Sequence, residues 1–275
     1  MHGFSVEFAE HRLYNPGEAT KNIDWKVYAR TDKLFTKKYE EETNLRCHIV
    51  IDASSSMYFP ADKKGRSLVY NKLEFSALAA ASLMNLLKKQ RDAYALSLFS
   101  EDLEFHSHCK SSTAHYRLLI NQLSALIETP KHNRQSFVAR NLHHIAEAIH
   151  RRSMVIIFSD MFNHAEETDE IFAALQHLRY NKHEVVVFHV VDKQKELDFD
   201  FENRPYEFVD METGERVKLQ SNQVKEFYVQ KMHEIEQNLR TKCLQYKIDF
   251  VETDINQSVT QVLMPYLMKR NRMRI

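Results

Sequence analysis

The sequence predicts an α/β fold: a doubly wound, mostly parallel sheet with helices on both faces. Short runs rich in β-branched and aromatic residues recur along the chain, and longer segments with apolar residues at every third or fourth position lie between them. The short runs are apolar at nearly every position, which is typical of strands buried on both faces. Because such strands alternate with amphipathic helices, we expect crossover connections and a parallel sheet.

The first half of the expected sheet begins after an irregular, charge-mixed segment at residues 1–44. Residues 46–52 (RCHIVID) form a short apolar run that predicts the first strand. An apolar stripe with a period of 3.6 residues predicts a helix over residues 69–91. Residues 93–100 (AYALSLFS) predict a second strand, and residues 103–109 can pair back against it as a hairpin.

The second half continues the alternation, with one interruption around Gly214. Two apolar runs, MVIIFSD and VVVFHVVD, predict further buried strands. In chain order, the remaining elements are expected to be helices over 116–127 and 136–150, a strand over 154–160, a helix over 166–181, a strand over 185–192, short strands over 206–210 and 216–219, a helix over 223–247, a strand over 248–252 and a helix over 257–268.

This pattern divides the chain into two parts. Residues 1–44 are expected to form an N-terminal arm packed on the core, and residues 45–275 a single α/β domain. Within the domain, residues 193–220 form a small β insertion, which is acidic, with eight Asp and Glu residues against five Lys and Arg. The length of the chain suits one hydrophobic core with additions of this kind.

Glycine is scarce: the 275 residues include 4 glycines, at positions 3, 17, 65 and 214. A loop that brings backbone N–H groups against a pyrophosphate needs several glycines close together. Dinucleotide-dependent oxidoreductases and P-loop nucleotidases are therefore excluded. Lys and Arg total 38, as do Asp and Glu, so the basic excess of a dedicated nucleic-acid-binding protein is also missing.

The three cysteines, Cys47, Cys109 and Cys243, lie far apart and form no C-x-x-C pair. Neither a disulfide framework nor a structural zinc site is expected, and a reducing cytoplasm suits the composition best. The first residues do not have the pattern of a signal peptide, and the longest apolar segment, residues 75–87, is too short to cross a bilayer. We therefore expect a cytoplasmic protein without a membrane span.

Polar residues follow two of the predicted parallel strands. Asp52 begins the sequence Asp-Ala-Ser-Ser-Ser-Met directly after the first strand, which adds the hydroxyls of Ser54 and Ser56. Asp160 ends the strand MVIIFSD. Because ligands of doubly wound sheets bind at the carboxyl ends of the strands, we expect these side chains to face one another. Oxygen ligands of this kind suit Mg²⁺ or Mn²⁺.

The D-x-S-x-S-M pattern at residues 52–57, together with Asp160, resembles the metal-ion-dependent adhesion site of von Willebrand factor A domains, which have a Rossmann-like fold. The segments HRLYNPGE at 11–18 and IDWKVYAR at 23–30 resemble the opening of the bacterial domain of unknown function 58 family. In that family such segments precede a von Willebrand factor A-like domain. The segment FVDMETG at 208–214 agrees with the family as well, so the resemblance covers essentially the whole chain.

The resemblance implies a set of metal-binding residues and a function. Asp52, Ser54 and Ser56 would form the first metal loop, Ser136 the second, where the family usually has Thr, and Asp160 the third. Ser136 can instead be the N-cap of the helix that follows it. In such domains an acidic residue of a partner completes the coordination of Mg²⁺ or Mn²⁺. The chain is then a protein-binding adaptor and not an enzyme, and its expected partner is a MoxR-type AAA+ ATPase that acts in protein or complex assembly.

Two other chemistries compete with this interpretation. Asp52 can be the nucleophile of a Mg²⁺-dependent phosphohydrolase. The aspartate-based phosphatases, however, place a second acid two residues later, where this chain has Ser54. Histidines are also numerous, and zinc could use His106 and His108 or His143 and His150, although no H-E-x-x-H motif is present.

Overall fold

The computed structural model describes residues 6–15, 20, 23–41, 45–60, 70–129, 134–161 and 168–273. The chain divides into two compact units, Met1–Asn44 and Leu45–Ile275. The division falls where the sequence changes from the charge-mixed segment to the first apolar run. That the first unit packs on the core of the second stays a prediction.

The first unit contains regular structure where an irregular segment was expected. Strand β1 (Val6–Leu13) pairs antiparallel with β2 (Phe35–Glu41), and the short helix α1 (Trp25–Thr31) lies between them in the sequence. Asp24 is the N-cap of α1, because its Oδ1 accepts hydrogen bonds from the backbone N–H groups of Lys26, at 3.0 Å, and Val27, at 3.3 Å. A two-stranded ribbon needs no continuous apolar run, which is why hydrophobic patterning did not reveal it.

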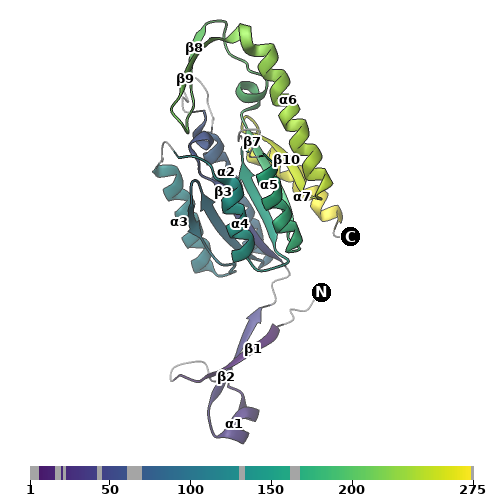
Figure 1. Ribbon diagram of the computed structural model, residues 1–275. Coiled ribbons are helices and arrows are strands. Elements are labelled where there is room, and N and C mark those ends of the chain that lie inside the picture. The colour runs from purple at the N-terminus through teal and green to yellow at the C-terminus, as the bar shows by residue number, and fades with distance from the viewer. Residues whose placement is uncertain are drawn as a thin grey trace. The chain divides into compact units, whose positions relative to one another are not determined.

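The second unit is built on a sheet of six strands in the order β10-β7-β6-β3-β4-β5. All neighbours pair in parallel except β4 and β5, which form the expected antiparallel hairpin. This confirms the α/β class and the mostly parallel sheet (Figure 1). The strands are β3 (Arg46–Asp52), β4 (Ala93–Phe99), β5 (Leu103–His106), β6 (Met154–Ser159), β7 (Glu184–Val191) and β10 (Asp249–Asp254).

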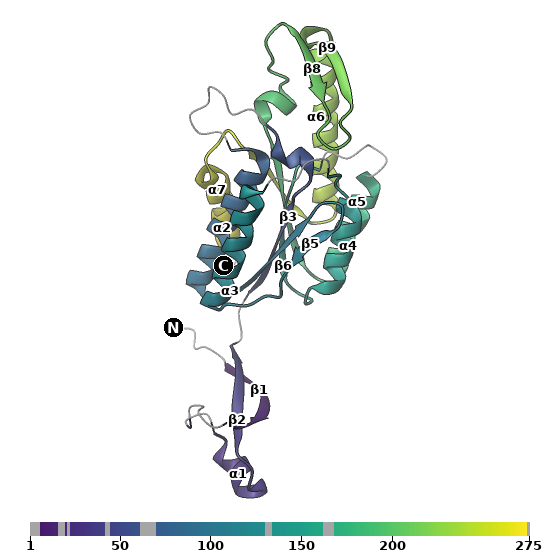
Figure 2. The same ribbon diagram turned by 90° about the vertical axis from the view of Figure 1, so that its left-hand side faces the viewer.

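Helices cover both faces of this sheet, as Figures 1 and 2 show. Residues of α2, α3 and α7 join one apolar core cluster, and residues of α4, α5 and α6 join a second one. The helices are α2 (Lys72–Gln90), α3 (Thr113–Glu128), α4 (Val138–Ala148), α5 (Thr168–Tyr180), α6 (Ser221–Gln245) and α7 (Val259–Met273).

The continuous apolar run of β3 follows from its place between the two layers of helices. Ile49 and Ile51 pack in the cluster of α2, α3 and α7, whereas Val50 packs in the cluster of α4, α5 and α6. All three side chains have no exposed surface. Successive side chains of a strand point to opposite faces, so a strand covered on both faces needs apolar residues at every position.

The acidic insertion forms the hairpin β8 (Pro205–Val209) and β9 (Arg216–Gln220), with strands on either side of Gly214 as expected. Gly214 has a φ of +76°, in the left-handed region that favours glycine. Aromatic rings attach the insertion to α6: the ring centroids of Phe199 and Tyr228 are 4.6 Å apart, and Phe199 also stacks on Phe208 at 5.6 Å. The hairpin therefore lies beside the amino-terminal half of α6 (Figures 1 and 2).

Most expected elements differ from the observed ones by one to five residues at their ends. The last helix is longer than expected, since α7 continues past Pro265 to Met273. None of the helices in the described ranges has the length and apolar character needed to cross a membrane.

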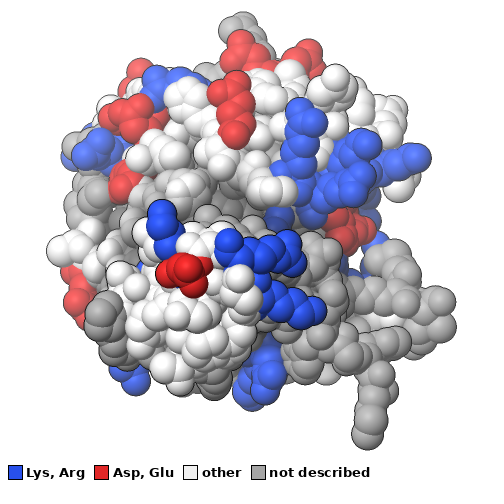
Figure 3. All heavy atoms as spheres, turned by 90° about the horizontal axis from the view of Figure 1, so that it is seen from below, with Lys and Arg blue, Asp and Glu red and all other residues white. Residues whose placement is uncertain are grey.

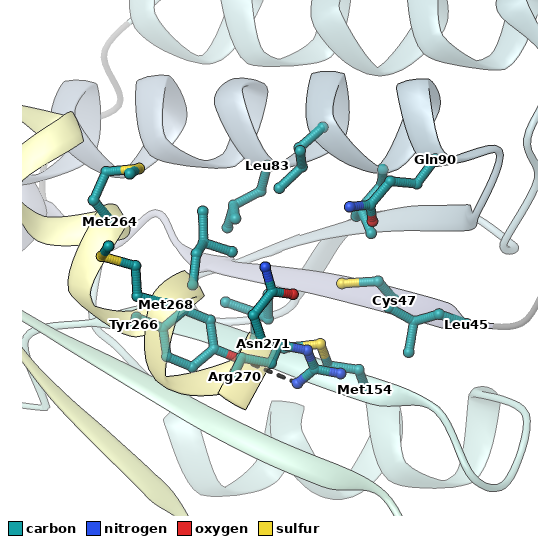
Figure 4. A pocket seen from close by; sticks show the side chains of 14 residues that line it. Leu45, Cys47, Leu83, Gln90, Met154, Met264, Tyr266, Met268, Arg270 and Asn271 are labelled. Carbon is teal, nitrogen blue, oxygen red and sulfur yellow. Dashed lines mark hydrogen bonds between the residues drawn. The ribbon is translucent and has the colours of Figure 1, made fainter. Parts of the chain in front are cut away.

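A pocket of about 230 Å³ lies between α2 and α7, near the amino-terminal ends of β3 and β6. Cys47, Leu83 and Met154 line it, as Figure 4 shows. Arg270 also lines the pocket and makes a bidentate ion pair with Glu184. Most of the side chains that line this pocket are apolar.

Candidate functional site

The candidate site lies where the connections from neighbouring strands diverge. From β3 the chain builds β4 and β5 on one side, and it later builds β6, β7 and β10 on the other side. Asp52 is the last residue of β3, and Asp160 follows the last residue of β6, the parallel neighbour of β3. A reversal of strand order of this kind leaves a crevice at the carboxyl edge of the sheet, where ligands bind in doubly wound folds.

Asp52 has no exposed surface, and three groups donate hydrogen bonds to its carboxylate. Oδ1 accepts from the backbone N–H of Ser54 at 3.0 Å. Oδ2 accepts from the hydroxyls of Ser136 and Ser159, each at 2.9 Å. Burial and the neighbouring charge of Asp160 raise the pKa of Asp52 to about 6, although the hydrogen bonds from Ser54 and Ser136 oppose the shift.

The serine loop after β3 holds its hydroxyls together and fixes a second loop. The Oγ atoms of Ser54 and Ser56 lie 3.1 Å apart, within hydrogen-bond distance. Ser55 makes a double link to Arg134: its N–H donates to the Arg134 carbonyl at 3.0 Å, and its Oγ accepts from the Arg134 N–H at 2.7 Å. This link sets the position of the chain two residues before Ser136.

Ser136 lies in the cluster and is not the N-cap of the following helix. Helix α4 begins at Val138, its N-cap position is Phe137, and no side chain caps it. The Ser136 hydroxyl instead donates to Asp52. The N-cap alternative is therefore wrong, and the hydroxyl lies beside the carboxylate that the resemblance pairs with it.

Asp160 makes an ion pair that the sequence did not reveal. The ammonium of Lys72, the first residue of α2, lies 2.7 Å from Asp160 Oδ2 and 2.6 Å from Glu196 Oε1. The Lys72 side chain has no exposed surface. Burial alone would lower the pKa of Lys72, but the charges of Asp160 and Glu196 outweigh it and hold this pKa above its usual value.

A further carboxylate, from Glu212 at the turn between β8 and β9, reaches the same cluster. Its Oε2 accepts a hydrogen bond from the backbone N–H of Ser136 at 3.2 Å. Its Oε1 is buried and has no hydrogen-bond partner among the residues that the structure describes. Burial raises the pKa of Glu212 to about 7; the Ser56 hydroxyl opposes the shift, and the charges of Asp160 and Asp52 add to it.

The donors in this cluster fit a hard divalent cation. Carboxylate and hydroxyl oxygens are ligands that Mg²⁺ and Mn²⁺ accept, and the buried Glu212 Oε1 without a partner is an oxygen that a cation would satisfy. Within the described ranges, no three His, Cys, Asp or Glu side chains are grouped closely enough to hold a metal by themselves. A site here therefore depends on the serine hydroxyls.

The histidines that were weighed as zinc ligands lie in separate places. The ring centroids of His106 and His108 are 5.8 Å apart. His143 lies beside His177 instead, with 3.0 Å between their Nδ1 atoms. His150 contacts Arg46. No zinc-binding group of three forms from these side chains in the described part of the chain.

Four residues of the cluster were missed at the level of sequence: Lys72, Ser159, Glu196 and Glu212. Lys72 gave a usable signal, since it lies four positions before the buried Ser76 on a helix face that is otherwise free of charge. Glu196 and Glu212 gave none, because both look like ordinary members of an acidic insertion. The insertion reaches the site at two points, through Glu196 in the segment after β7 and through Glu212 at the β8–β9 turn.

Two solved structures resemble this chain at low sequence identity. A protein from Bacteroides thetaiotaomicron described as "conserved hypothetical protein BatB" is 14% identical, with a TM-score of 0.49, over 84% of this chain and 99% of that one. An "aerotolerance-related membrane protein" from Bacteroides fragilis NCTC 9343 is 16% identical, with a TM-score of 0.46, over 79% and 100%. A likeness of this degree carries no information about function.

No curated protein matches the chain. The family described as "Protein of unknown function DUF58" does match, over residues 10–238, which include parts of both units and all the residues of the candidate site. The chain therefore belongs to the DUF58 family.

Proposed function

We propose that this protein is a metal-assisted protein-binding module with a von Willebrand factor A-type adhesion site. Asp52, Ser54, Ser56, Ser136 and Asp160 would hold Mg²⁺ or Mn²⁺. The ion, when bound, would offer a coordination position to an acidic side chain of a partner protein. The module would act as an adaptor and not as a catalyst.

One observation carries this proposal: hydrogen-bond donors from three distant parts of the sequence converge on the buried carboxylate of Asp52. Ser54 comes from the loop after β3, Ser136 from the loop before α4, and Ser159 from the end of β6. These short side chains come from distant parts of the sequence, so each must be positioned by its own element. Such an arrangement depends on the whole fold and does not arise from local sequence alone. Ser55 supports it by linking the first loop to the second.

The electrostatics of the cluster also support a cation. Asp52, Asp160 and Glu212 interact electrostatically, and the ammonium of Lys72 contacts Asp160 and Glu196. Lys72 compensates Asp160 and Glu196. Buried like charges repel one another, so a divalent ion near Asp52 and Glu212 would stabilise the folded protein.

The partner class follows from the family resemblance. We propose a MoxR-type AAA+ ATPase as the protein that presents the acidic residue, with action in the cytoplasm during protein or complex assembly. The three cysteines are free thiols, which agrees with a reducing compartment.

A Mg²⁺-dependent phosphohydrolase is the less favoured alternative. An aspartate nucleophile must reach a phosphorus atom, whereas both Asp52 oxygens accept hydrogen bonds inside the protein and the residue has no exposed surface. No observation on the described residues favours this activity over docking.

Calorimetric titration with MgCl₂ and MnCl₂ tests the metal site. Asp52→Asn keeps the shape of the side chain and removes its charge, so we expect its affinity for either ion to fall by at least about tenfold. Asp102→Asn is the matched control, because Asp102 lies after β4 at the same edge with a largely exposed carboxylate. Equal affinities of the wild type and Asp52→Asn would overturn the metal site.

A second measurement tests docking. The wild-type protein should capture a MoxR-type ATPase from lysate of its own organism in the presence of Mg²⁺, and EDTA or Asp52→Asn should abolish the capture. Capture that is insensitive to EDTA would mean that the partner binds elsewhere. Turnover of a generic phosphate ester that is lost in Asp52→Asn would favour the phosphohydrolase.

A further inference from the structure

The turn between β8 and β9 brings an acidic side chain of the chain itself to the candidate site. Glu212 Oε2 accepts the backbone N–H of Ser136, and the carboxylate lies close enough to Ser56, Asp52 and Asp160 to interact electrostatically with all three. These four residues belong to the set that would hold the cation. Glu212 lies 76 positions from Ser136 in the sequence, so only the folded insertion brings them together.

The backbone of the turn is organised to hold Glu212 in this place. Asp210 Oδ1 accepts hydrogen bonds from the N–H groups of Glu212, at 2.7 Å, and Thr213, at 3.1 Å. The Gly214 N–H closes the turn by donating to the Asp210 carbonyl at 2.9 Å. An aspartate that binds the N–H groups two and three residues ahead is a common way to stiffen a turn.

Apolar packing fixes the same turn to the domain. Met211, next to Glu212, packs against the core cluster that contains Met57 and Tyr58 of the serine loop. Farther back, the rings of Phe208 and Phe199 join the hairpin to Tyr228 of α6. The contact between Glu212 and Ser136 is thus one of several contacts that attach the hairpin to the domain.

The charge of Glu212 makes its position informative. The carboxylates of Asp52 and Asp160 repel it, and burial penalises its ionised form. The backbone N–H of Ser136 donates to Oε2, and Oε1 is buried without a hydrogen-bond partner among the described residues. A carboxylate in solvent would avoid both costs, so its position is favourable when a positive charge lies between it and Asp52.

We propose that Glu212 occupies, from within the same chain, the position that an acidic residue of a partner would take at the Asp52–Ser136 site. This inference rests on the proposed metal-assisted docking function. It makes the β8–β9 hairpin a built-in competitor: the partner's carboxylate binds only after the hairpin has moved Glu212 away from Ser136. When no partner is bound, Glu212 fills this position and covers the ion-binding loops.

Water-proton relaxation with Mn²⁺ tests the proposal on the full-length protein. Bound Mn²⁺ keeps water in each coordination position that no protein atom fills. We expect Glu212→Ala to retain Mn²⁺ binding and to show a higher relaxivity, by about one bound water. Acetate, the simplest carboxylate, should then lower the relaxivity of Glu212→Ala at concentrations at which the wild type does not respond.

Two controls keep the outcomes distinct. Glu215→Ala removes an exposed acid from the same hairpin and should behave like the wild type. Amide hydrogen exchange at Ser136 reports the contact without any metal, and exchange should be faster in Glu212→Ala but nearly unchanged in Glu212→Gln, which keeps an acceptor oxygen.

Each result separates the inference from the function beneath it. Equal relaxivity and equal acetate response in the wild type and Glu212→Ala would overturn the role of Glu212 while leaving the metal site intact. If no variant binds Mn²⁺, the proposed function fails and the inference fails with it. Faster exchange at Ser136 in Glu212→Ala would then identify the contact as a purely structural one.

Discussion

The parallel strands of the central sheet all end on one side, the carboxyl edge, and all begin on the other, the amino edge. These two sides differ in the kind of polar residues that they carry. At the carboxyl edge, the short side chains of Asp52, Ser54 and Ser136 are buried and hydrogen-bonded to one another. At the amino edge, the long side chains of Arg151 and Lys182 are exposed beside a shallow pocket. Figure 3, seen from below, shows exposed Lys and Arg side chains among Asp and Glu side chains on the surface.

The edges differ in buried like charge, whereas backbone strain is found at both. The carboxyl edge crowds like charges, since Asp52 and Asp160 raise the pKa of Glu212 beyond the effect of burial. The backbone is strained at both edges: Arg91, Arg152 and Lys182 at the amino edge have φ values of 60°, 61° and 64°, and Met161 at the carboxyl edge has a φ of 50°. Crowded charge is a property that a ligand can relieve, whereas a strained turn is not. The comparison therefore points to the carboxyl edge as the functional one.

The largest expected effect is that of Lys72→Met. This change leaves the buried carboxylates of Asp160 and Glu196 without their counter-charge, so we expect the free energy of unfolding to fall by about 3–5 kcal/mol. Urea denaturation measures it. Arg151→Met at the other edge should produce little change, and Lys72→Met with Glu196→Gln should recover part of the loss. The comparison would break if Lys72→Met and Arg151→Met proved equally stable.

The second effect depends on pH and concerns His48, which lies between the two edges. Burial, with the nearby His106, lowers the pKa of His48 to about 3. The folded protein therefore binds fewer protons than the unfolded chain between pH 6.5 and 3, and the stability that His48 contributes is lost as the pH falls through this range.

The loss amounts to about 1.4 kcal/mol per pH unit below 6.5, or roughly 2–3 kcal/mol by pH 4.5. His48→Gln isolates it, because glutamine does not titrate and can still bond to Ser97, the partner of His48 Nε2 at 2.8 Å. The difference in unfolding free energy between wild type and variant should shrink on acidification. A difference that is constant with pH would show that His48 is not kept neutral.

A third change, Ser136→Ala, removes one hydroxyl from the carboxyl edge. Hydrogen bonds to charged groups contribute about 1.5–3 kcal/mol, and two other donors to Asp52 remain, so we expect a loss of about 1.5 kcal/mol. Divalent-ion affinity should fall as well. Ser136→Thr keeps the hydroxyl and should behave like the wild type in thermal unfolding and calorimetry. Loss of affinity in Ser136→Thr but not in Ser136→Ala would contradict the assignment of the hydroxyl.

The smallest effect is expected at the amino edge and has the opposite sign. Arg91 ends α2 in the left-handed conformation, where glycine is favoured, so Arg91→Gly should raise the unfolding free energy by up to about 1 kcal/mol. Lys89→Gly, inside the same helix, should lower it by about 1 kcal/mol. Two destabilising substitutions would mean that the Arg91 side chain contributes more than its backbone costs.

The parallel sheet could be predicted from the sequence because each central strand carries its own signal. Val50 lies between Ile49 and Ile51, and only a strand that is buried on both faces needs such a run. The ends of the helices were less accurate, since capping depends on contacts from elsewhere in the fold. Ser136 resembles an N-cap in the sequence but bonds to Asp52 across 84 residues.

The candidate site was predictable only in part, for a similar reason. Asp52 and Asp160 could be placed because strand ends follow from strands and the carboxyl ends of parallel strands share an edge. Lys72, Glu196 and Glu212 depend on how the start of α2 and two parts of the insertion meet that edge, which no local pattern encodes. The structure in residues 6–41 was also missed, because its pairing joins largely polar segments that are far apart in the sequence.

Helix α6 has a mechanical consequence for this arrangement. Its carboxyl-terminal part packs in the core through Leu239 and Cys243, whereas its amino-terminal part carries the hairpin through Tyr228. At 1.5 Å per residue, the 18 residues from Leu239 back to Ser221 make a lever of about 27 Å, so a tilt of roughly 5° moves its far end by about 2 Å. A hydrogen bond of 3.2 Å does not survive such a displacement. A tilt of α6 about Leu239, opposed by the packing of Met232 against Val191 and Leu197, would therefore be enough to release this contact.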